Sequence, residues 1–306
     1  IHFTEEDRIF RDQIRRFAER EVAPIADEID HEDRFPKEVI PKFGDMGLLQ
    51  WSVPEEYGGP EGSLTKLCIA REELARYSLS LSVMVGENGN GMALPLLFAG
   101  TEAQKQKYFP MLAKGRTLVA FALSEPEAGS DAAALRTRAV RDGDDWLITG
   151  NKIFVTCGPV AEYVLVLART NEAPRAKGVS AFIVDTSLPG VTRGPKNAKM
   201  GYNGATPNCD FFFEDVRVPA DARIGGDGEG FTIAMKCMEF NRPAMSASAV
   251  GIAQGALDQA VLNALLEAAG VAAVKDRVSI LIHLADDGLD APAAAPVSSS
   301  VAPESE

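Results

Sequence analysis

The chain has 306 residues, a length that predicts about two domains with room for a buried core. Hydrophobic residues make up 46% and charged residues 25%, the balance of an ordinary soluble globular protein. The formal net charge of −13 disfavours nucleic-acid phosphates and anionic lipid surfaces as partners, because like charges repel. We also find no apolar run long enough to span a bilayer. Neither nucleic acid nor a membrane is therefore expected as a partner.

Cysteine and histidine are sparse and scattered. The four cysteines form no C-x-x-C pair, so they are expected to be reduced thiols: Cys68, Cys157, Cys209 and Cys237. The three histidines are too far apart in the sequence to suggest a metal site: His2, His31 and His283. No secretory signal peptide is recognisable. The expected location is the cytoplasm of a bacterium or, in a eukaryote, the mitochondrial matrix.

Residues 1–116 have the pattern of a helical domain. Thr4 with Asp7 and Thr101 with Gln104 have the spacing of capping boxes, in which the first residue caps a helix and the second bonds back to it. Apolar residues recur at helical spacing after Thr4, and Pro24 is expected to end that helix. A further helical stretch is expected from residue 64 through residue 85.

The pattern changes to a β domain at residues 117–222. The turn Asp142-Gly143-Asp144 lies between two strand-like runs and predicts a hairpin. Apolar and β-branched residues predict further strands at residues 153–156, 163–167, 180–184 and 211–213. The expected architecture of this domain is a β-sandwich or barrel-like sheet.

Helical spacing returns in residues 223–288, which we interpret as a partial C-terminal helical domain. A long helix is expected from Phe231 to about Ala269, with a kink at Pro243, and a shorter one at residues 271–285. Residues 289–306 are rich in Ala, Pro and Ser, which predicts a disordered tail. The whole pattern predicts an α+β fold of helices, then strands, then an incomplete helical bundle.

Two segments of the β domain could bind a ligand. Residues 121–131 form a strand end followed by a turn with hydroxyl groups and small residues, where backbone N–H groups could hold anionic oxygens. An ordinary Ser/Gly-rich surface turn is the alternative. In residues 150–158, Phe154 and Thr156 are expected to point to the same face of a strand, which suits a flat ring needing one hydrogen bond. Simple strand packing is the alternative there.

These two segments, and the order of helices, strands and helices, resemble the acyl-CoA dehydrogenase family. The resemblance covers the chain from residue 3 to about residue 261. Four further stretches support it: Val53–Gly59, Gly100–Tyr108, Phe213–Pro219 and Arg242–Gly255.

The resemblance implies that the chain binds FAD against the β domain. Phe121, Leu123 and Ser124 would line the flavin ring, with the Ser124 hydroxyl bonded to its pyrimidine side. Gly129 and Ser130 would lie at the pyrophosphate, and Phe154 and Thr156 beside the hydride-accepting edge. The implied reaction is the α,β-desaturation of an acyl-CoA thioester to a trans-2-enoyl-CoA. Ser130, Glu239 and Arg242 would contact that substrate, and an electron-transfer flavoprotein would accept the electrons.

The family's catalytic base is not recognisable in this sequence. Some relatives carry it on the long helix just before an Arg-Pro pair, where this chain has Asn241, an amide that cannot act as a base. Glu239 is a weak candidate, and a solvated carboxylate or a CoA contact is the alternative role for it. Arg242 could equally form a surface or interface salt bridge.

The family normally continues into a full helical bundle whose FAD-binding and catalytic segments are not recognisable after residue 261. The sequence therefore predicts a truncated or divergent C-terminal domain. Two alternatives to an active dehydrogenase stay open: a non-catalytic flavin- or acyl-CoA-binding remnant, and an assembly subunit that pairs with other chains. A homo-oligomer or a hetero-oligomer is possible.

Overall fold

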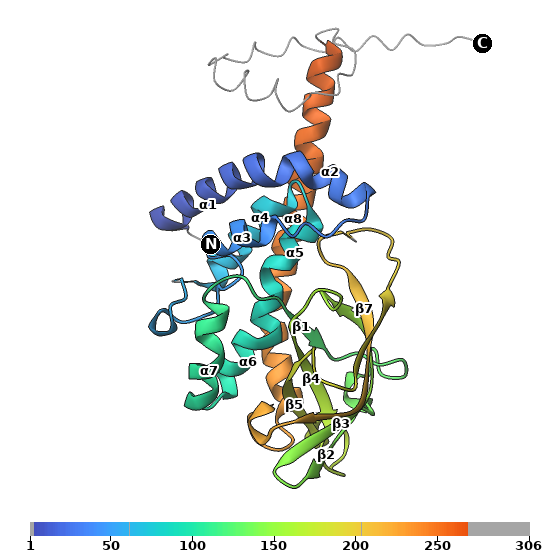
Figure 1. The fold of residues 1–306 in the computed structure, drawn as a ribbon. Coiled ribbons are helices and arrows are strands. Elements are labelled where there is room, and N and C mark those ends of the chain that lie inside the picture. Colours follow the sequence, from blue (N-terminus) through green and yellow to red (C-terminus); the bar gives the residue numbers. More distant parts are fainter. Residues whose placement is uncertain (1–2, 61, 203, 269–306) are drawn as a thin grey trace, which may run out of the picture. The chain divides into compact units, whose positions relative to one another are not determined.

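The computed structural model describes residues 3–60, 62–202 and 204–268 (Figure 1). Residues 1–256 form one compact unit, and residues 257–306 form a second. The helix expected at residues 271–285 and the disordered tail expected at residues 289–306 lie outside the described residues.

The first helices form a nearly continuous run, in contrast to the prediction that Pro24 ends it. The run comprises α1 (Glu5–Phe17), the π-helical η1 (Ala18–Val22) and α2 (Ala23–His31), and α3 (Val39–Asp45) follows after a loop. Pro24 occupies the first turn of α2, where its missing N–H has little cost. The π-helical turn before it shifts the hydrogen-bond pattern, so the chain stays helical through the proline. The capping box of Thr4 and Asp7 is confirmed.

The second helical group is longer than predicted. It comprises η2 (Glu55–Tyr57), α4 (Leu64–Ala75), α5 (Leu79–Asn88), the π-helical η3 (Gly89–Ala93), α6 (Leu94–Ala99) and α7 (Glu102–Leu112). The helical stretch passes residue 85 because η3 connects α5 to α6 without a loop. Asn88 at the end of α5 donates to the Thr117 carbonyl at 2.7 Å and accepts from the Val119 N–H at 2.9 Å. These two bonds attach the helical region to the first strand.

The strands pair into one eight-stranded sheet in the order β6-β7-β3-β2-β4-β5-β8, with β1 paired to β4. They are β1 (Val119–Ala122), β2 (Arg138–Asp142), β3 (Asp145–Thr156), β4 (Tyr163–Arg169), β5 (Val179–Asp185), β6 (Val191–Lys196), β7 (Asn208–Val218) and β8 (Arg223–Ile224). Short 3-10 turns lie between them at η4 (Ala132–Ala134), η5 (Arg175–Gly178) and η6 (Ala220–Ala222). The predicted hairpin is confirmed, since Asp142 pairs with Asp145 and Gly143 has a φ of 62°.

The sheet takes part in two apolar clusters. One lies among the strands themselves and includes Trp146, Phe182 and Phe211. The other combines strand residues such as Leu165 with Phe109 of α7. The sheet therefore has its own core and a second surface that packs against helices, which confirms the α+β fold.

The last described element is the long helix α8 (Gly230–Ala268). Its glycines allow a close approach to the end of α4. A Cβ atom at Gly251 would lie 2.1 Å from the Glu72 carbonyl oxygen, and one at Gly255 would lie 2.3 Å from that of Arg76. Any side chain at either position would push the two helices apart.

Helix α8 also corrects the expectation that no segment could span a bilayer. Among the described residues, Gly230–Leu266 is long and apolar enough to cross a membrane, judged by length and composition only. Its many alanines raise the mean hydropathy without bulky side chains. Buried positions such as Ala244 and Ser248 show that part of this helix packs against protein.

Candidate active site

The two predicted ligand-binding segments lie side by side in the β region. The N–H of Ile153 on β3 donates to the Ser124 carbonyl at 2.9 Å. The Lys152 ammonium donates to the Leu123 carbonyl at 3.2 Å. Residues 121–131 and 150–158, which are separate in the sequence, are therefore brought together at one place on the sheet.

A buried ion pair anchors the turn that follows Ser124. The Glu125 carboxylate accepts from the Lys152 Nζ at 2.7 Å and from the N–H groups of Arg136 at 2.6 Å and Thr137 at 3.0 Å. Burial lowers the pKa of Lys152 to about 8, although Glu125 opposes the shift. Burial alone would raise the pKa of Glu125, but Lys152 and the two N–H donors lower it overall. The carboxylate stays charged and fixes the start of the turn.

Phe154 is the most exposed aromatic side chain of this site, with an exposed fraction of 64%. Its φ of 55° lies in the left-handed region, which is uncommon for a bulky residue. It sits where β3 and β7 shift register, between the pairs Lys152–Phe211 and Val155–Cys209. Ile153 and Phe154 together oppose the single residue Asp210, which is the arrangement of a β-bulge. Val155 is buried, whereas Thr156 is partly exposed like Phe154, in agreement with the predicted shared face.

The polar side chains that were predicted to bind a ligand have no hydrogen-bond partner within the described part of the chain. The side-chain hydroxyls of Ser124, Ser130 and Thr156 form no hydrogen bond there, and each residue is at least partly exposed. A Cβ atom added at Gly129 would meet nothing within 4 Å, so the backbone of the turn is open to a ligand. The buried Oδ1 of Asn208 is also unpaired. These free groups around an exposed ring fit a flat ligand with a polar edge and an anionic part.

The predicted apolar cofactor contacts Phe121 and Leu123 are half-buried at the end of β1. Both pack against the apolar cluster shared by sheet and helices. Their remaining exposed surface lies on the segment that continues to Ser124.

Of the predicted residues of α8, Asn241 contacts the helical region instead. Asn241 accepts a hydrogen bond at 3.2 Å from the guanidinium of Arg71 on α4. Glu239 and Arg242 are exposed, and the side chain of neither is paired within the described residues. No hydrogen bond among the described residues joins these three side chains to the segments 121–131 or 150–158. The structure thus groups the cofactor candidates, Ser130 among them, but no such bond links the α8 candidates Glu239 and Arg242 to them.

A buried charged cluster surrounds Asn241 and was not predicted from the sequence. Arg71 is fully buried, and it also donates to the Ser248 hydroxyl at 3.1 Å and to the Met245 sulfur at 2.7 Å. Burial lowers the pKa of Arg71, and Glu87 on α5 is close enough to oppose this shift electrostatically. Burial raises the pKa of Glu87 to about 7, and Arg71 and Lys199 only partly oppose the shift.

A signal for the buried pair of the β region was present in the sequence. Lys152 falls on the even-numbered face of β3, together with the buried residues Trp146 and Ile148. A lysine on a buried face needs an opposite charge, so its position predicts a buried carboxylate partner. No comparable signal marks Asp210, because it lies opposite Ile153 and Phe154 only as a result of the β-bulge.

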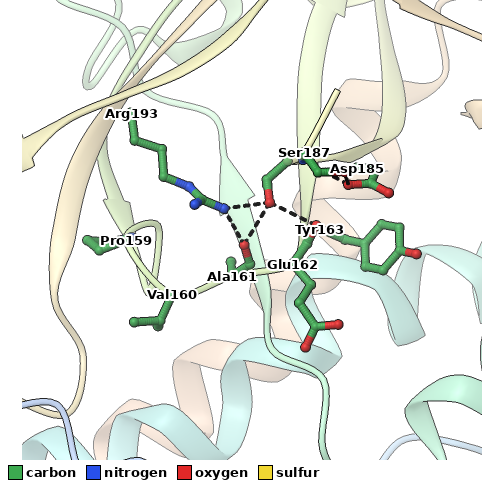
Figure 2. Close-up of a pocket in the computed structure, with 9 residues that line it drawn as sticks. Pro159, Val160, Ala161, Glu162, Tyr163, Asp185, Ser187 and Arg193 are labelled. Carbon is green, nitrogen blue, oxygen red and sulfur yellow. Dashed lines mark hydrogen bonds between the residues drawn. The ribbon is translucent and has the colours of Figure 1, made fainter. Parts of the chain in front are cut away.

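A polar surface pocket of about 400 Å³ lies elsewhere on the sheet (Figure 2). It is lined by residues 159–163, 185–187 and Arg193, none of which was predicted to bind a ligand. Arg193 donates across it to the Ala161 carbonyl at 2.6 Å, as Figure 2 shows. The predicted ligand-binding residues around Ser124 and Phe154 lie outside this pocket.

Two family profiles match the chain. The acyl-CoA dehydrogenase N-terminal domain matches residues 4–116, and the acyl-CoA dehydrogenase middle domain matches residues 120–216. A curated relative, cyclohex-1-ene-1-carbonyl-CoA dehydrogenase from Syntrophus aciditrophicus, is 42% identical over 259 residues, covering 84% of this chain and 62% of the relative. The chain spans about two thirds of the length of the curated relatives it matches.

Solved structures agree with these matches. Butyryl-CoA dehydrogenase from Megasphaera elsdenii superposes with a TM-score of 0.82 at 34% identity, covering 94% of this chain and 76% of that one. An acyl-CoA dehydrogenase complexed with FAD from Bacillus anthracis superposes with a TM-score of 0.74 at 30% identity, covering 81% and 43%. The sequence profiles, the curated relatives and the fold together show that this chain belongs to the acyl-CoA dehydrogenase family.

Proposed function

We propose that the chain is an FAD-dependent oxidoreductase that desaturates an acyl-CoA thioester between its α and β carbons. The observation that carries the proposal is the junction of the two predicted cofactor segments, held by the Ile153–Ser124 hydrogen bond. Around that junction lie unbonded hydroxyl groups and an exposed aromatic ring. Two similar proteins are dehydrogenases of cyclohex-1-ene-1-carbonyl-CoA and butyryl-CoA, and one structural neighbour is complexed with FAD.

In this proposal the chain's own residues bind and orient the cofactor. Phe121 and Leu123 cover one apolar part of the flavin, and Phe154 lies beside its reacting edge. The hydroxyls of Ser124 and Thr156 donate to its polar edge, and Ser130 with the open backbone at Gly129 holds the pyrophosphate. The bound FAD supplies the acceptor for the hydride that leaves the substrate's β carbon.

The substrate side of the proposal depends on α8. Arg242 and Glu239 are exposed and unpaired among the described residues, so both are available to contact CoA. Asn241 stands where some relatives carry the glutamate that removes the α proton, and an amide cannot take up that proton. Glu239 stays a weak candidate for this step, since its side chain is exposed to solvent.

A second candidate function follows from Asn241. Its amide oxygen is committed to the buried guanidinium of Arg71, so the position has a structural contact in place of a base. This favours a chain that binds flavin or acyl-CoA without turnover, alone or as a subunit in an assembly with other chains.

The proposed partners are those of the family. An electron-transfer flavoprotein would accept the electrons, and the chain would act as a homo-oligomer or a hetero-oligomer. The proposed location is the bacterial cytoplasm, or the mitochondrial matrix in a eukaryote.

The test is to purify the chain, add FAD, remove the excess, and record the visible absorbance of bound flavin. Acyl-CoA thioesters, including butyryl-CoA, are then added without oxygen. Bleaching of the flavin band supports the dehydrogenase, and a stable band with bound thioester supports the second candidate. A chain that stays colourless contradicts the dehydrogenase and also contradicts flavin binding in the second candidate.

A matched pair of variants locates the cofactor. Ser124→Ala is expected to weaken FAD binding about tenfold, because one hydrogen bond to the ligand is lost. Ser187→Ala removes an exposed serine of the unrelated pocket in Figure 2 and is expected to leave the dissociation constant unchanged. Equal effects of the two variants would contradict the assigned site.

A further inference from the structure

The bulge at Ile153 and Phe154 places a large aromatic ring in an unfavourable backbone conformation. A bulky residue with a φ of 55° is strained, and such strain persists only where the surrounding structure enforces it. Burial does not enforce it here, because 64% of the Phe154 side chain is exposed. Some other interaction must therefore hold this residue.

Side chains of β7 hold the backbone of Phe154 from the opposite side of the bulge. Its N–H donates to the Asp210 carboxylate at 3.2 Å, and its carbonyl accepts from the Asn208 amide at 3.4 Å. Backbone groups that would normally pair with the neighbouring strand are thus bonded to side chains. The first of these bonds is the shorter and involves a carboxylate oxygen, so it is the stronger of the two.

Asp210 is itself held in place. Its Oδ1 also accepts from the Asn197 amide at 3.1 Å, beyond the end of β6. The carboxylate therefore joins two segments to the bulge and fixes the direction in which the Phe154 ring projects. Bulges commonly re-aim a side chain next to a functional site in this way.

We propose that Asp210 is a positioning residue that presents the Phe154 ring to the flat ring system of the flavin. This inference rests on the proposed binding of FAD. Asp210 acts through Phe154 and does not itself touch the cofactor. The matched variants are Asp210→Ala, which removes the acceptor, and Asp210→Asn, which keeps an acceptor oxygen at the same place.

The first experiment measures the position of the ring without FAD. The two natural tryptophans, Trp51 and Trp146, are buried and therefore poorly accessible to the quencher acrylamide. In a Phe154→Trp variant, the fluorescence that acrylamide does quench is therefore that of residue 154. Adding Asp210→Ala is expected to lower the fluorescence anisotropy of this emission, because the side chain is released. Asp210→Asn is expected to restore it. Unchanged anisotropy in Asp210→Ala would overturn the positioning role, with circular dichroism checking that each variant is folded.

The second experiment connects the ring to the cofactor through a double-mutant cycle in the dissociation constant of FAD. Asp210→Ala is expected to weaken binding about tenfold when Phe154 is present and to have no effect in a Phe154→Ala background. Equal losses in both backgrounds would overturn the inference, because Asp210 would then act independently of the ring. If no variant or parent chain binds FAD, the proposed function fails, and the anisotropy still decides whether Asp210 holds the ring.

Discussion

The two regions of the molecule bury charge in different ways. In the β region, Lys152 and Glu125 have side-chain exposed fractions of 0% and 6%, and their charged atoms are 2.7 Å apart. In the helical region, Arg71 and Glu87 are also buried, but no hydrogen bond or ion pair among the described residues joins them. Arg71 bonds to neutral acceptors on α8 instead.

The difference in contact explains the difference in charge state. Beside Lys152, the pKa of Glu125 is lowered in spite of burial, because the ammonium and two N–H groups stabilise the carboxylate. Within the described part of the chain Glu87 has no such direct donor, so burial dominates and its pKa rises to about 7. Direct pairing thus makes one cluster a fixed anchor, whereas separation leaves the other with a carboxyl that changes charge near neutral pH.

The largest expected effect comes from breaking the direct pair. Lys152→Met leaves the Glu125 carboxylate buried without its counter-ion, and we expect a loss of about 3–5 kcal/mol in the free energy of unfolding. Urea denaturation at pH 7 measures this loss. Glu125→Gln combined with Lys152→Met removes both charges and is expected to recover much of the stability.

An exposed pair provides the control. Lys107 and Asp221 are 3.1 Å apart but have side-chain exposed fractions of 49% and 55%. Lys107→Met is expected to change the free energy of unfolding by less than about 1 kcal/mol, because water screens this pair. If the single and double variants of the buried pair lose equal stability, the anchor does not depend on charge pairing.

The second prediction concerns the separated cluster and its pH dependence. The folded chain holds a proton on Glu87 up to about pH 7, whereas the unfolded chain releases it near the ordinary pKa of 4.5. Stability therefore falls as the pH rises between these values, since the unfolded state binds fewer protons. Glu87→Gln mimics the protonated form, so we expect it to exceed the parent chain in stability by about 3 kcal/mol at pH 8.

The measurement is the difference in unfolding free energy between Glu87→Gln and the parent chain from pH 4.5 to pH 8. The difference is expected to vanish at the acid end and to grow up to pH 8. The exposed Glu32→Gln is the matched control and is expected to show no such trend. A difference that does not vary with pH would show that the Glu87 carboxyl is not neutral in the folded chain.

The comparison also shows where sequence reasoning succeeds. Local signals predicted the helix starts at Thr4 and Thr101 and the hairpin at Gly143, because each depends on residues next to one another. The π-helical turns before Pro24 and after Asn88 were missed, since they allow helices to continue where local rules predict an end. The candidate cofactor segments were recognised by resemblance, and their grouping required the fold.

Strand β3 shows why the exposure of Phe154 could not be predicted from alternation alone. Its buried residues are even-numbered through Lys152 and odd-numbered from Val155 onward, because the bulge shifts the alternation by one residue. A simple alternation rule therefore fails at the point where Phe154 is exposed. Arg71 offers even less signal, since its hydrogen-bond partners on α8 are brought close only by packing. No hydrogen-bond partner of Glu87 is found among the described residues.

The smallest expected effect tests whether neutral acceptors on α8 stabilise Arg71. The Ser248 hydroxyl accepts from the Arg71 Nε at 3.1 Å and lies 2.8 Å from the Ser82 hydroxyl. Ser248→Ala is expected to lower the free energy of unfolding by about 1–2 kcal/mol, because it leaves a buried donor of Arg71 unpaired. Ser246→Ala, at an exposed serine of the same helix, is expected to change it by less than about 0.5 kcal/mol. Equal effects would mean that the buried guanidinium of Arg71 does not need this acceptor.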